Sequence, residues 1–146
     1  MQPVLQINFW AVLVCIISNV FIGFLWYGPL FLKPWAKEVG IDADKKPSAA
    51  EMIPSMLMMI GGAFLTAYVL AHSIEVWRPS VWGHSGDLPS WQYGMYASMF
   101  SFIGFYLPPL LSLVAWEKKS WKLFSINAGY WFISVTVMGQ ILANWR

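Results

Sequence analysis

The sequence predicts an all-α membrane protein in which four helices cross the bilayer as one compact bundle. Its sixteen charged residues (nine basic, seven acidic) fall in short polar gaps. The gaps separate four uncharged, mostly apolar stretches, Met1–Leu32, Met52–Ile74, Leu88–Trp116 and Leu123–Trp145. Each stretch is long enough for the roughly 20 apolar residues that a helix needs to span a hydrocarbon core about 30 Å thick.

The composition supports this assignment and predicts a single domain. Of the 146 residues, 58% are hydrophobic and only 11% are charged, which is outside the range of soluble domains. The single domain is expected to cover residues 1–146. Its four spans are expected near residues 7–30, 52–74, 91–116 and 122–144, which leaves no room for a separate domain. The net charge of +2 comes from lysines in loops, so we expect a lipid bilayer as the partner and no nucleic acid.

The positions of the basic residues predict the orientation. Seven lysines lie in the loops after spans one and three, whereas the other side has only Arg78 and Arg146. Because cytoplasmic loops carry an excess of Lys and Arg, both termini are expected outside the cytoplasm.

Span one is expected to end at Gly28-Pro29, because the residue before a proline resists the helical conformation. At about 100° per residue, Asn8, Cys15, Asn19 and Trp26 fall in one line, which we expect to face the bundle interior. The following segment, residues 31–35, is predicted to lie along the membrane interface.

Span two has a helix-start signal at Ser48, with Glu51 three residues later as in a capping box. Its small residues Ala63, Thr66 and Ala67 share one face and would allow close approach of another helix.

Span three contains Pro108-Pro109, which predicts a kink in its second half. Its predicted interior face consists of Gly94, Ser98, Ser101, Pro108 and Ser112.

Span four has two faces that lipid would not favour. One carries Asn127, Trp131, Ser134 and Met138, and we expect it to fill the bundle interior. The other carries Gly129, Thr136, Gln140 and Ala143, and is predicted to contact another protein; alternatively, Gln140 simply reaches the outer interface. Together with span one, these considerations give a predicted set of interior polar and packing residues: Asn19, Trp26, Tyr27, Asn127, Tyr130 and Trp131.

The sequence predicts neither a catalytic site nor a metal site. Apart from Lys122 at the edge of the fourth, the predicted spans contain no Asp, Glu, Lys or Arg, and ionisable residues inside the membrane usually mark proton relays and coupled transport. The chain has no nucleotide-binding loop, zinc-binding HExxH, CxxC or GxSxG motif. No cofactor is predicted. His72, at the end of span two, is the one weak ligand candidate, for a tetrapyrrole metal; the simpler interpretation is an interfacial histidine.

Two segments resemble a known family. The run from Gly23 to Leu30, GFLWYGPL, followed by Lys33 and Trp35, is similar to the first signature of the bacterial family called domain of unknown function 1761. The run from Leu123 to Trp131, LFSINAGYW, continuing to Met138-Gly139 and Trp145, resembles its last helix. The resemblance implies a small, multi-pass protein of the bacterial inner membrane and no assigned activity.

These observations favour a non-enzymatic integral membrane protein. The leading hypothesis is a structural or accessory subunit, or an oligomeric scaffold, that contacts its own copies or other integral membrane proteins. The alternative is a transport protein or channel formed by oligomers, with Asn19, Asn127 and Gln140 along a polar path.

The predicted orientation can be tested with reporter fusions at Arg146. An alkaline phosphatase fusion should be active and a green fluorescent protein fusion dark, because the first reporter folds only outside the cytoplasm and the second only inside. The reverse pattern would show that the lysine distribution does not set the orientation.

Overall fold

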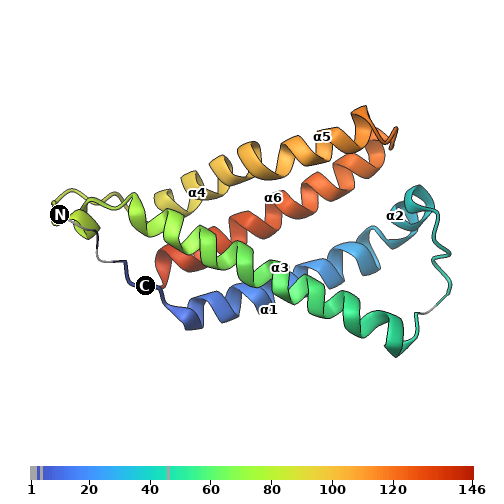
Figure 1. Ribbon diagram of the computed structural model, residues 1–146, viewed down its shortest axis with the longest axis horizontal. Coiled ribbons are helices and arrows are strands. Elements are labelled where there is room, and N and C mark those ends of the chain that lie inside the picture. Colours follow the sequence, from blue (N-terminus) through green and yellow to red (C-terminus); the bar gives the residue numbers. More distant parts are fainter. Residues whose placement is uncertain (1–2, 4, 46) are drawn as a thin grey trace.

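The computed structural model describes residue 3, residues 5–45 and residues 47–146, and within them the only regular elements are helices. Four helical units are long and apolar enough to cross a membrane: Phe9–Leu30, Ala49–Val76, Ser90–Ala115 and Trp121–Asn144. The predicted all-α architecture with four spans is therefore confirmed. α1 begins and α6 ends at the same end of the bundle, here called the terminal end, and the two lysine loops lie at the opposite, lysine end (Figure 1).

The first span consists of α1 (Phe9–Leu25) and a wide turn over Trp26–Leu30. The side chain of Asn8 accepts hydrogen bonds from the amides of Trp10 and Ala11 and so caps the start of α1. Gly28 has non-helical backbone angles just before Pro29, so the predicted end of the first span is a kink. The short helix α2 (Leu32–Val39) follows and ends at Gly40, whose positive φ of 75° suits glycine.

The second span is α3 (Ala49–Val76), and it starts as the sequence predicts. The Ser48 hydroxyl accepts from the Glu51 amide, while the Glu51 carboxylate accepts from the Ser48 amide, which completes a capping box. Ala63 and Ala67 are buried, in agreement with the predicted close approach of another helix. In Figure 1, α3 crosses α1 and diverges from it toward the lysine end.

The third span differs from the predicted one in how it bends. α4 (Ser90–Ser101) and α5 (Leu107–Ala115) are joined by a π-helical turn over Phe102–Tyr106. Pro108 and Pro109 lack amide protons, so they cannot bond the carbonyls four residues back, and the wide turn precedes them. The extra residue rotates the helix face. Gly94 and Ser98 are buried as predicted, but Pro108 and Ser112 are exposed and Leu110 is buried in their place.

The fourth span, α6 (Trp121–Asn144), is the central helix of the bundle. It contacts α1 and α3 on one side and α4 and α5 on the other (Figure 1). The closest approach is to α4: a Cβ atom built on Gly94 would lie 2.6 Å from the carbonyl oxygen of Gly139. The two backbones are therefore in direct contact, which only glycine permits.

This contact gives a stability prediction. Gly139→Ala places a methyl group against the hydroxyl of Ser98 and the carbonyl of Gly94, so α4 must move away from α6. We expect a loss of about 1–3 kcal/mol in the free energy of unfolding in detergent. Gly62→Ala is the matched control, because a Cβ there meets nothing within 4 Å, and it should leave stability unchanged or slightly raised. Equal behaviour of the two variants would contradict the packing.

Candidate functional site

A network of amide and aromatic side chains joins α1 to α6. The Tyr130 hydroxyl donates to the Asn19 side-chain oxygen at 3.1 Å, and Asn19 is 2% exposed. Nearer the lysine end, the Tyr27 hydroxyl donates to the Asn127 side-chain oxygen at 2.9 Å. The indole of Trp26 donates to a backbone carbonyl of α6, that of Ile126, at 2.9 Å. Because lipid offers no hydrogen bonds, these pairs satisfy polar groups that would otherwise be costly.

The same region contains a continuous row of aromatic rings. Ring centroids lie 5.4 Å apart for Trp35 and Tyr27, 5.1 Å for Tyr27 and Tyr130, 5.1 Å for Tyr130 and Trp131, and 4.8 Å for Trp131 and Tyr106. These are spacings at which aromatic pairs attract. The row links α2 at the lysine end with the π turn of the third span. The structure thus brings the predicted interior residues Asn19, Trp26, Tyr27, Asn127, Tyr130 and Trp131 into one network between α1 and α6.

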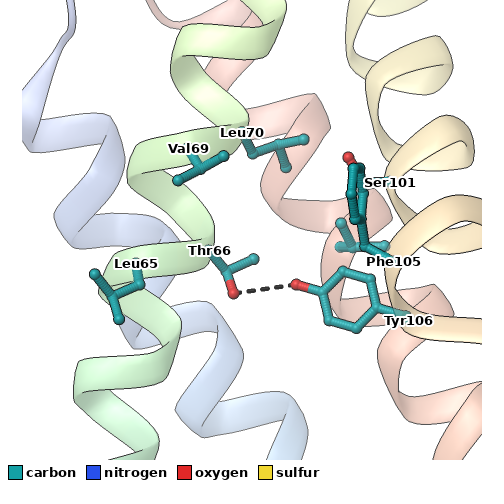
Figure 2. Close-up of a pocket in the computed structure, with 8 residues that line it drawn as sticks. Leu65, Thr66, Val69, Leu70, Ser101, Phe105 and Tyr106 are labelled. Atoms are coloured by element: carbon teal, nitrogen blue, oxygen red, sulfur yellow. Dashed lines mark hydrogen bonds between the residues drawn. The ribbon is translucent and has the colours of Figure 1, made fainter. Parts of the chain in front are cut away.

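Tyr106, at the end of this row, points across to α3. Its hydroxyl lies 3.1 Å from that of Thr66, and the two groups face each other across a cavity of about 270 Å³ (Figure 2). The cavity lies between α3, the π turn and α6. Its lining is otherwise apolar except for Ser101: Leu65, Val69, Leu70, Phe105 and Val135.

A second, larger cavity continues from the first toward the terminal end. It has a volume of about 740 Å³ and shares Ser101 and Phe105 with the smaller cavity. Its far end is formed by Trp77 and by the loop residues Pro79, Gly86 and Leu88. Together the two cavities form a groove between α3 and the third span, here called the α3–α4 groove.

Charged residues close the bundle at the terminal end. Arg78 and Glu75 are 2% and 4% exposed, and the guanidinium Nε lies 3.0 Å from a Glu75 carboxylate oxygen. The second oxygen of Glu75 accepts from Arg146 at 2.8 Å. Arg78 also donates to the carbonyl of Ala143 at 2.7 Å and lies over the ring of Tyr93. The terminal clamp, formed by Glu75, Arg78 and Arg146, thereby ties α3, α4 and the end of α6 together.

The loop between α3 and α4 is held by Asp87. The Ser80 hydroxyl and the Ser80 amide donate to its carboxylate at 2.7 and 2.8 Å. These hydrogen bonds hold the pKa of Asp87 below its usual range. The indole of Trp82 donates to the carbonyl of Val76, so the short helix Pro79–Trp82 folds back onto the end of α3.

One comparison with known proteins identifies the chain's relatives. The model of a family described as protein of unknown function (DUF1761) matches residues 10–143. The chain belongs to the DUF1761 family. The resemblance found in the sequence is thus confirmed, over almost the whole chain. No match to a curated protein or to a solved structure was found.

The predicted partner face of this DUF1761 protein lies largely inside the chain. A Cβ atom on Gly129 would lie 2.8 Å from the Trp26 ring, and Ala143 is fully buried beside α4. The Thr136 hydroxyl is also buried, and the Gln140 side chain donates to the carbonyl of Trp91. The expected outer face is corrected for a physical reason: α6 is central, so both of its polar faces meet helices of the same chain.

The amides proposed for a transport path are separated in the DUF1761 bundle. Asn19, Asn127 and Gln140 each bond a different partner at a different height. His72 lies near the end of α3, with its Nδ1 2.8 Å from the carbonyl of Tyr68 and its ring against the Tyr68 ring. Its closest interactions are therefore with its own helix.

Sequence reasoning missed the terminal clamp and the Thr66–Tyr106 pair. Glu75 and Arg78 both follow the predicted end of the second span at residue 74, but their spacing of three residues suits an ion pair on one helical turn and is a signal in the sequence. The hydroxyl pair had no such signal, because Tyr106 turns toward α3 only through the π turn.

The terminal clamp of the DUF1761 protein can be tested with a double-mutant cycle. Arg78→Met leaves the buried Glu75 carboxylate with Arg146 alone, so the free energy of unfolding should fall by about 1–3 kcal/mol. Glu75→Gln combined with Arg78→Met should cost less than the sum of the single changes, because neither buried charge then remains without the other. Lys122→Met, on an exposed residue, is the control. Additive single effects in detergent unfolding would argue against a coupled pair.

Proposed function

We propose that this protein is a non-enzymatic accessory or scaffold subunit of an assembly in the bacterial inner membrane. The observation that supports it best is the free half of α3. Every residue from Glu51 to Met58 is exposed, and the part of α3 nearest the lysine end stands away from the other helices (Figure 1). The rest of the bundle is closed at the terminal end, so the half-helix projects from a rigid base.

The glycines of α3 make this half suitable for another helix. In the regular helices of the other spans, Gly23, Gly94, Gly129 and Gly139 lie against a neighbouring helix or its side chains. A Cβ on Gly61 or Gly62, in contrast, would meet nothing within 4 Å. Gly28 and Gly104 also have open space beside them, but both lie in π-helical turns. Small residues at membrane helix contacts allow backbones to approach each other closely. A helix face that contacts only lipid would gain nothing from two adjacent glycines. The proposed partner is therefore a transmembrane helix, either of a second copy or of another integral membrane protein.

The non-enzymatic part of the proposal is supported by the polar groups of the network, which are amides and phenols that bond one another. The alternative, a transport path through oligomers, has less support, because Asn19, Asn127 and Gln140 are each engaged within the chain. A tetrapyrrole metal at His72 would have to use Nε2, because Nδ1 bonds the Tyr68 carbonyl, and a single histidine does not by itself support such a contact.

The test is photo-crosslinking of the full-length protein in its native membrane. A benzophenone amino acid at Met58, which is 71% exposed, should give an adduct with another protein. The same probe at Ile17, which is 58% exposed on α1, serves as the matched control and should label lipid only. An adduct of twice the chain mass identifies a second copy, and any other mass identifies a different subunit.

A variant completes the test. Gly61→Leu with Gly62→Leu adds bulk where the chain itself has open space, so the monomer should fold normally and the Met58 adduct should disappear. A wild-type protein that labels only lipid at both positions, and that is a monomer by native mass spectrometry, would overturn the proposal.

A further inference from the structure

We propose that the α3–α4 groove binds an uncharged, membrane-dissolved molecule with a carbonyl oxygen and a long apolar body, of which a quinone is the chemical class. The proposal is independent of the accessory role, because the groove lies beside the half of α3 at the terminal end, whereas the free face belongs to the half at the lysine end. It rests on the size of the groove, its lining, and the depth and bonding of its hydroxyl pair.

The groove has the dimensions and lining of a ligand site. Its two connected cavities have volumes of about 270 and 740 Å³, and the larger falls within the roughly 300–1,000 Å³ of small-molecule pockets. Among the described residues that line them, none is charged, and the aromatic ones are Trp77, Tyr93, Tyr96, Phe100, Phe105 and Tyr106. Such a lining favours a neutral ligand with a flat ring.

The Thr66–Tyr106 pair retains hydrogen-bonding capacity. Ser55, Ser73, Ser98 and Ser125 each donate to the carbonyl one turn back in their own helix. Within the part of the chain that the structure describes, Thr66 instead faces Tyr106. Two hydroxyls contain two donors and their mutual bond uses one, so one donor is left for an acceptor in the groove.

The depth of the Thr66–Tyr106 pair in the membrane determines which kind of ligand carbonyl can accept its hydrogen bond. Thr66 lies ten residues before the end of α3 at Val76, about 15 Å along the axis at 1.5 Å per residue. This is near the middle of a hydrocarbon core about 30 Å thick. The ester carbonyls of phospholipids lie at the interface, and their acyl chains have no acceptor. A quinone ring dissolves at this depth and carries two carbonyl acceptors, while its tail can follow the larger cavity toward Trp77.

The π turn is what creates this geometry. It rotates Tyr106 toward α3, whereas the preceding Phe105 is 78% exposed at the rim. Tyr106 is also fixed from behind by the ring of Trp131 at 4.8 Å. π turns of this kind are frequent at functional sites.

The experiment uses full-length protein in phosphatidylcholine nanodiscs, titrated with a decyl-substituted benzoquinone while tryptophan fluorescence is recorded. Saturable quenching is expected for the wild type, since Trp77 lines the larger cavity. Thr66→Val with Tyr106→Phe preserves shape but removes both donors, and should weaken binding at least about tenfold. Leu57→Phe, on the same helix outside the groove, is the control and should bind as the wild type does.

Two further measurements distinguish a specific binding site from a groove that is filled by lipid. Diacylglycerol, added at the same concentration, should not compete, because its carbonyls stay at the interface. Ser101→Leu, which narrows both cavities, should abolish saturable quenching while circular dichroism and gel filtration show a folded protein. Non-saturable quenching, equal affinity of the wild type and the double variant, or full competition by diacylglycerol would each overturn the proposal.

Discussion

The bundle depends on the direct backbone contact between α4 and α6 at Gly94 and Gly139. At this distance the Ser98 hydroxyl, bonded to Gly94 in its own helix at 2.7 Å, also lies 2.9 Å from the carbonyl of Val135 on α6. The same contact places Ala143 against α4, where its carbonyl accepts from Arg78. In a membrane, where lipid tails are as apolar as leucine, such close packing and hydrogen bonding replace the hydrophobic effect as the source of helix association.

A consequence of this central contact is that the two ends of the molecule differ. At the terminal end α3, α4 and α6 converge, and the clamp of Glu75, Arg78 and Arg146 fixes them. At the lysine end α6 remains in contact with α1, α2 and α5, while α3 diverges from the bundle (Figure 1). The asymmetry separates two surfaces on one helix: a free half at the lysine end that suits another helix, and a half at the terminal end that borders the α3–α4 groove.

The sequence predicts the spans, the capping box at Ser48 and the buried faces of α1 and α3, because these follow from local periodicity and composition. It does not predict what depends on three-dimensional placement. The π turn adds a residue and exposes Pro108 and Ser112, which an ideal helix would bury. α6 buries both of its polar faces because it is central, and single-helix periodicity cannot distinguish a neighbour in the same chain from a partner.

The polar groups differ between the terminal end and the interior of the bundle in a way that follows from their cost in hydrocarbon. The charged clamp lies at the terminal end of α3, where headgroups and water lower the penalty of ionisation. The amides Asn19 and Asn127 lie deeper, and each is paired with a tyrosine hydroxyl. The pair at Thr66 and Tyr106 consists of hydroxyls alone, the cheapest of these groups to hold near the core. A bundle that needed only stability would have leucine and phenylalanine there. Two hydroxyls held at a groove by a π turn are better explained by an occupant that accepts a hydrogen bond.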